Sequence, residues 1–96
     1  MNKALNMAEK KLVGKVTEEE KNEIKAIFER KNGLSELIKI LPADNEALYE
    51  KLVMDMGVTS TRFQEWWDQK AAKYQWENRP DGRWEIDFNT NDIYLL

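Results

Sequence analysis

Apolar residues recur at the spacing of a helix over residues 24–41 of the chain. Those on one helical face are Ile24, Ile27, Phe28, Leu34, Ile38 and Leu41. Just before them, the segment VTEEEKNEI places Thr17 three residues ahead of Glu20, which is the spacing of a capping box. The pattern therefore predicts a helix that begins at about Glu18, and Pro42 is expected to end it.

The tripeptide KNG at residues 31–33 can interrupt this helix, because asparagine and glycine reach the left-handed conformation that ends helices. The apolar phase nevertheless runs through the tripeptide without a reset, and Lys31 is its only polar member. We therefore expect one long helix from about Glu18 to Leu41, in which Gly33 can introduce a kink. Two shorter helices separated at Gly33 are the alternative.

Two further helices are expected between residues 44 and 74. The first runs from about Asn45 to Met56, with Asp44 as its cap and Gly57 as a typical helix stop. Its inward-facing apolar residues are Leu48, Leu52, Val53 and Met56. The second runs from about Ser60 to Tyr74.

Alternation of apolar and polar residues predicts a β-hairpin at the C-terminal end. The segments WEIDF at 84–88 and IYLL at 93–96 alternate with period two, and the polar segment NTND joins them. The segment KLVGKV at 11–16 has β-forming valines, and its glycine permits a bulge, but the sequence leaves open whether it forms a strand.

These elements predict an α+β fold in which three helices are followed by a C-terminal β-hairpin. Residues 1–12 are expected to form a loosely ordered N-terminal segment, because they lack a sustained pattern. Residues 13–96 are expected to form a single helical domain that ends in the hairpin, since the length suits one hydrophobic core.

Three of the four tryptophans lie in FQEWWDQKAAKYQW, residues 63–76. On a helix, Trp67 shares a stripe with other apolar residues and is expected in the core. Trp66 lies about 100° round the helix from Trp67, among charged neighbours, so we expect it to be partly exposed. Trp76 follows the helix and is expected to pack with Trp84 beneath the hairpin.

Cysteine and histidine are both absent from the 96 residues. The chain therefore has no disulfide, no thiolate metal site and no Ser-His-Asp or Cys-His arrangement. Glu85 and Asp87 share one face of a strand, but that pattern is more typical of a solvated surface than of a catalytic pair. We expect a protein that is not an enzyme and that has no cofactor and no metal site.

The formal net charge of −3 gives the chain no bulk attraction to nucleic acid. Its longest apolar run is far shorter than the roughly 18 residues of a membrane-spanning helix. The first residues also lack the apolar segment of a secretion signal. These features predict a cytoplasmic protein without membrane contact.

A winged-helix-like nucleic-acid-binding regulator is one functional hypothesis. The segment ALYEKLVMDMGVTSTRFQEWWDQ has the layout of a helix-turn-helix with its turn at Gly57-Val58-Thr59, and the hairpin would be the wing. The hypothesis is weakened by charge, because the second helix has mixed signs and the hairpin is acidic, whereas a DNA reader normally shows a clustered basic face.

Peptide or protein binding is the second hypothesis, and it is the one that we favour. Trp66, with Arg62 and Lys70 beside it, is a candidate anchor for a partner. The last strand, which contains Ile93 and Tyr94, is a candidate docking edge, because an unpaired strand can accept an extended peptide.

The chain also resembles a known family over about residues 13–96. The segments GKVTEEEKNEI, FERKNGLSELIKIL, NEALYEKLV, FQEWWDQKAAKYQW and WEIDFNTNDIYL together look like the small accessory protein of CXXX repeat peptide modification systems. The double tryptophan with the following Tyr-Gln-Trp and the terminal Trp-Glu-Ile-Asp-Phe are its most specific parts.

The resemblance implies a bacterial accessory protein encoded with a ribosomally made precursor peptide, which contains Cys-x-x-x repeats, and with a radical SAM maturase. That precursor peptide or that modifying enzyme would be its partner. No catalytic residue carries over, and near the hairpin loop this chain has Asn91 where the resemblance leads us to expect a cysteine.

Overall fold

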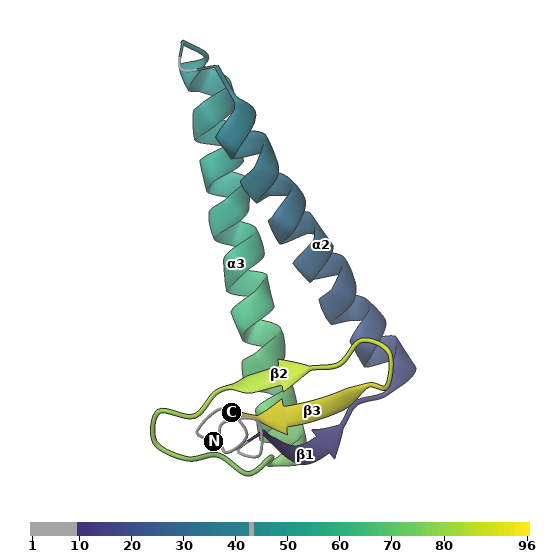
Figure 1. Ribbon diagram of the computed structural model, residues 1–96. Helices are drawn as coiled ribbons and strands as arrows, with labels where there is room; N and C mark the ends of the chain where they lie inside the picture. The colour runs from purple at the N-terminus through teal and green to yellow at the C-terminus, as the bar shows by residue number, and fades with distance from the viewer. Residues whose placement is uncertain (1–9, 43) are drawn as a thin grey trace, which may run out of the picture. The chain divides into compact units, whose positions relative to one another are not determined.

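The computed structural model describes residues 10–42 and 44–96 and contains, within them, two helices and three strands (Figure 1). In chain order these are β1 (Lys11–Lys15), α2 (Glu18–Ile40), α3 (Glu46–Tyr74), β2 (Trp84–Ile86) and β3 (Asp92–Leu95). The chain divides into two compact units. We call residues 10–21 and 70–96 the sheet unit, and residues 22–69, apart from residue 43, the helical unit.

The first helix starts where the capping pattern predicts. The backbone N–H of Glu20 donates to the Thr17 hydroxyl at 3.1 Å, and the Glu20 carboxylate accepts from the backbone N–H of Thr17 at 2.9 Å. This reciprocal pair satisfies two N–H groups that have no partner within the helix. From there α2 runs for 23 residues, straight through Gly33, so the single-helix interpretation is confirmed.

The second helix runs for 29 residues, where the sequence predicts two helices. Gly57 has no positive φ and stays helical, and the Thr61 hydroxyl donates back to the Gly57 carbonyl at 3.0 Å. That hydroxyl is thus used inside the helix instead of capping a new one. The helix start also differs from the prediction, because Leu48 donates its N–H to the side chain of Asn45, at 3.3 Å, and Asn45 rather than Asp44 is the cap.

The sheet has three antiparallel strands in the order β1-β3-β2. The predicted hairpin forms its β2–β3 half, in which Ile86 lies opposite Ile93. The segment at 11–16, which the sequence left open, supplies β1 as the third strand, and its register shifts between Leu12 and Gly14. Gly14 sits against Trp76, and a Cβ atom there would lie only 2.5 Å from the indole nitrogen.

The prediction of three helices followed by a two-stranded hairpin is therefore wrong. There are two helices, because Gly57 does not end α3, and three strands, because β1 pairs with β3 across more than 70 residues of chain. Local pattern could not show that pairing, since it depends on residues distant in sequence. Loose order was predicted for residues 1–12, and residues 1–9 of that segment lie outside the described residues.

Aromatic side chains pack in each unit. In the helical unit the rings of Phe28 and Phe63 lie 6.5 Å apart, and Phe63 and Trp67 lie 6.4 Å apart. The Lys31 ammonium lies 4.7 Å from the Phe63 ring centre, which explains the one polar residue in the apolar phase of α2. Hydrophobic burial and ring contacts thus hold α2 and α3 together along this stretch.

In the sheet unit, Trp76 stacks on Tyr74 at 5.6 Å and meets Trp84 edge-on at 5.7 Å. The expected packing of Trp76 with Trp84 is confirmed. Ile93 and Leu95 of β3 are fully buried, so the central strand supplies the apolar centre of this unit.

Candidate partner-binding surfaces

The five residues proposed from sequence for partner binding are divided between the two units. Arg62 and Trp66 belong to the helical unit, whereas Lys70, Ile93 and Tyr94 belong to the sheet unit. Trp66 is only 5% exposed, in contrast to the partial exposure that was expected. Its ring packs edge-on against Trp67 at 4.9 Å, so both adjacent tryptophans are core residues. Arg62 is exposed and Lys70 is half-buried.

The proposed docking edge at Ile93 and Tyr94 is wrong. These residues lie in β3, which is the central strand and has hydrogen-bonded neighbours on both sides. Strand addition needs an open edge, and the edges of this sheet are β1 and β2. Ile93 is fully buried, and the Tyr94 ring lies 4.8 Å from the ammonium of Lys10.

A buried carboxylate, Glu20, is the strongest electrostatic feature of the sheet unit, and sequence reasoning identified only its capping role. Its carboxylate accepts from the Lys73 ammonium at 2.6 Å and from the Tyr74 hydroxyl at 2.5 Å. Burial raises the pKa of Glu20, but the hydrogen bonds from Lys73, Thr17 and Tyr74 outweigh it and hold the pKa at about 2.

The partners of Glu20 respond in the opposite direction. The hydrogen bond to Glu20 raises the pKa of the Tyr74 phenol and the pKa of the Lys73 ammonium. All three groups therefore keep their ordinary neutral-pH charges, and none is prepared to give or take a proton. The cluster joins the start of α2 to the end of α3 and is a structural element of the fold.

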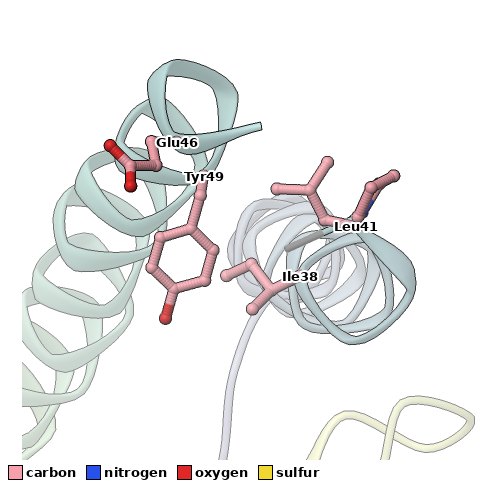
Figure 2. Close-up of a pocket in the computed structure, with 5 residues that line it drawn as sticks. Ile38, Leu41, Glu46 and Tyr49 are labelled. Atoms are coloured by element: carbon pink, nitrogen blue, oxygen red, sulfur yellow. The ribbon is translucent and has the colours of Figure 1, made fainter. Parts of the chain in front are cut away.

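A hollow of about 350 Å³ lies at the end of the helical unit where α2 and α3 are joined. We call it the loop-end hollow. Its lining residues are Ile38, Leu41, Pro42, Glu46 and Tyr49. Figure 2 shows the Ile38 and Tyr49 side chains directed toward each other across it. The wall is apolar apart from Glu46 and the Tyr49 hydroxyl, so it suits an apolar side chain of a partner more than a charged one.

Exposed apolar side chains are frequent in the unit that contains this hollow. With the exception of Leu12, every exposed large apolar side chain of the described residues lies in the helical unit. Leu37 is 49% exposed and Ile40 is 76% exposed, and both lie next to the hollow on α2. Leu48 and Val53, which were expected to face inward, are also exposed, at 41% and 43%. A concentration of this kind marks interaction surfaces more often than ordinary solvent-facing helix.

The described residues contain no group of three or more acidic, histidine or cysteine side chains placed to hold a metal ion. Within the same residues, no helix combines the length and apolarity needed to cross a membrane. The turn that the helix-turn-helix hypothesis requires is not formed, because α3 is helical through Gly57, Val58 and Thr59.

Comparison with known proteins adds no identification. No family model, curated protein or solved structure matches the chain.

Proposed function

We propose that this chain is a non-catalytic accessory protein of the bacterial cytoplasm that assists the maturation of a ribosomally synthesised Cys-repeat peptide. The loop-end hollow, with the exposed apolar residues around it, is the observation that carries the binding role. The class of partner, a precursor peptide or its radical SAM maturase, rests on the sequence resemblance. The proposed function requires no cofactor.

Binding through the hollow has a clear physical basis. Leu37, Ile40 and Tyr49 leave apolar surface in water, and a partner that covers them gains the free energy of burying it. The hollow adds shape, since a single apolar side chain of the partner can enter between Ile38 and Tyr49. The helix-turn-helix hypothesis has no corresponding observation in its favour, because its turn is absent from α3.

The test is a binding measurement with the purified full chain against a synthetic peptide that contains Cys-x-x-x repeats and, separately, against a radical SAM maturase of the kind that the resemblance implies. We expect at least one of the two to bind. Leu41→Ala combined with Tyr49→Ala should weaken that binding roughly tenfold or more, because both side chains line the hollow.

The matched control is Leu12→Ala, which removes an exposed apolar side chain from the sheet unit and should leave binding unchanged. Circular dichroism of each variant verifies that the helices are retained. If neither probe binds the wild-type chain, the proposed function is wrong. Equal losses in the hollow variant and the Leu12 control would instead reject the hollow as the binding surface.

A further inference from the structure

A second hollow lies along α3, away from the loop-end hollow. This groove, which we call the α3 groove, has a volume of about 540 Å³ and is lined by α3 alone, through Met54, Gly57, Val58, Thr61, Arg62 and Glu65. Met54 is 72% exposed and Val58 is 59% exposed. A Cβ atom at Gly57 would meet open space, so none of the residues that the structure describes covers the groove at this point.

The α3 groove is on the face of α3 that does not pack on α2. The residues of α3 that contact α2 include Asp55, which is ion-paired with Arg30, and Phe63, which packs on Phe28. Phe63 lies five residues after Val58, about 140° round the helix, and the buried Thr59 lies about 100° round it, so Val58 points to another side of α3. Most of the Met54 and Val58 side chains on that side is exposed.

The charged residues at the two ends of the groove indicate which kind of partner can bind there. Lys51 and Glu65 lie seven residues before and after Val58, which is almost two helical turns and about 10 Å in each direction along the same stripe. Neither side chain forms an ion pair with any residue in 10–42 or 44–96. Along this stripe, the apolar pair Met54 and Val58 is followed by Lys51 toward one end and by Arg62 and then Glu65 toward the other.

We propose that the α3 groove binds the same groove of a second copy of the chain, with the two α3 helices antiparallel about a two-fold axis near Val58. This arrangement places Lys51 of each copy opposite Glu65 of the other and buries Met54 and Val58 between them. A parallel arrangement would place Lys51 opposite Lys51 and Glu65 opposite Glu65, and such like-charge pairs are unfavourable. Twofold symmetry makes both ion pairs form together.

Two further residues of the groove agree with this arrangement. Arg62, four residues after Val58, falls level with Met54 of the second copy, where its methylene groups can cover apolar surface. Gly57, next to the axis, allows the two helix backbones to approach closely. The inference does not rest on the proposed function, because it uses a different surface and a different partner.

The absence of cysteine from the chain allows a direct test. Val58→Cys places one thiol beside the expected axis, and Val53→Cys, also exposed and on α3 but outside the groove, is the matched control. Under mild oxidation at equal concentration, we expect the Val58 variant to form covalent dimers rapidly and the Val53 variant to form few. Equal cross-linking of the two variants would overturn the proposal.

Charge reversal tests the antiparallel register independently. Lys51→Glu and Glu65→Lys, each alone, should weaken self-association roughly tenfold in sedimentation velocity, because each variant places like charges together at both ends of the interface. The double variant should restore it, since every pair is opposite again. A chain that stays monomeric at all concentrations, or a double variant as weak as the single ones, would show the proposal to be wrong.

Discussion

Glu20 combines two roles that usually fall to different residues. It completes the capping box at the start of α2 and it accepts hydrogen bonds from Lys73 and Tyr74 at the end of α3. The first role follows from the spacing to Thr17, and the second depends on residues more than 50 positions away. An acidic residue in a first helical turn can thus be buried and structurally important, although most such residues are solvated.

This network predicts a specific dependence of stability on pH. The pKa of Glu20 is about 2 in the folded chain, below its ordinary value of 4.5. The contribution of Glu20 to the free energy of unfolding should therefore be complete above about pH 4.5 and lost as pH falls toward 2. Glu20→Gln should lower the free energy of unfolding by roughly 2 kcal/mol at neutral pH and make stability less dependent on pH in that acid range.

Urea unfolding of both chains between pH 2 and 7 measures this effect. Glu19→Gln is the matched control, because Glu19 is an exposed acid in the same first turn, and it should leave the acid dependence in place. Parallel pH profiles of the Glu20 variant and the wild-type chain would contradict the assignment.

At the scale of elements, the glycines of β1 and α2 have opposite surroundings. Gly14 lies in the bulged part of β1 against the indole of Trp76, whereas the space beside Gly33 in α2 is open. The first glycine is required by close packing, whereas the second makes the unfolded chain more flexible and so costs more conformational entropy on folding.

A pair of alanine substitutions is expected to show this contrast. Gly14→Ala should lower the free energy of unfolding by about 1–3 kcal/mol, because its methyl group overlaps the Trp76 ring. Gly33→Ala should raise the same free energy by about 0.5–1 kcal/mol, since alanine favours the helix and meets nothing. Thermal or urea unfolding measures the change in the free energy of unfolding for each variant. A Gly14→Ala variant that is more stable than the wild-type chain would show that β1 does not pack closely on Trp76.

At the scale of the whole molecule, burial is unevenly distributed within each unit. In α3 the buried residues are Thr59, Trp66 and Trp67, and none of them lies before the middle turn of the helix. The first half of α3 carries mostly exposed side chains, including those around the loop-end hollow. In the sheet unit, the central strand β3 is both the most buried and the only strand paired on two sides among the described residues.

Hydrogen exchange should follow this distribution. Within α3, we expect backbone amides at 49–54 to exchange faster than those at 63–67, because fewer buried contacts oppose local opening there. In the sheet unit, the amides of Ile93 and Leu95 should be among the slowest. Uniform exchange along α3 would contradict this. Repeating the measurement with a bound partner should slow exchange at 49–54 if the loop-end hollow is the binding surface.

The sequence alone determined the features that depend on near neighbours. The capping box of α2 and the alternation of the β2–β3 hairpin each follow from residues a few positions apart, whereas the apolar phase favoured a helix through Gly33 and left two helices as the alternative. Such signals are local because hydrogen bonds and side-chain periodicity repeat every few residues.

Only the tertiary structure decided the features that depend on distant partners. Lys11–Lys15 becomes a strand because β3 offers it an edge, and that pairing makes β3 central and unavailable for docking. Trp66 is buried despite its charged sequence neighbours, because burial is set by what surrounds a side chain in space. A glycine such as Gly57 can end a helix or lie within one, so its own conformational preference does not decide between the two. Here α3 continues through it, with contacts to α2 on either side, at Asp55 and at Phe63.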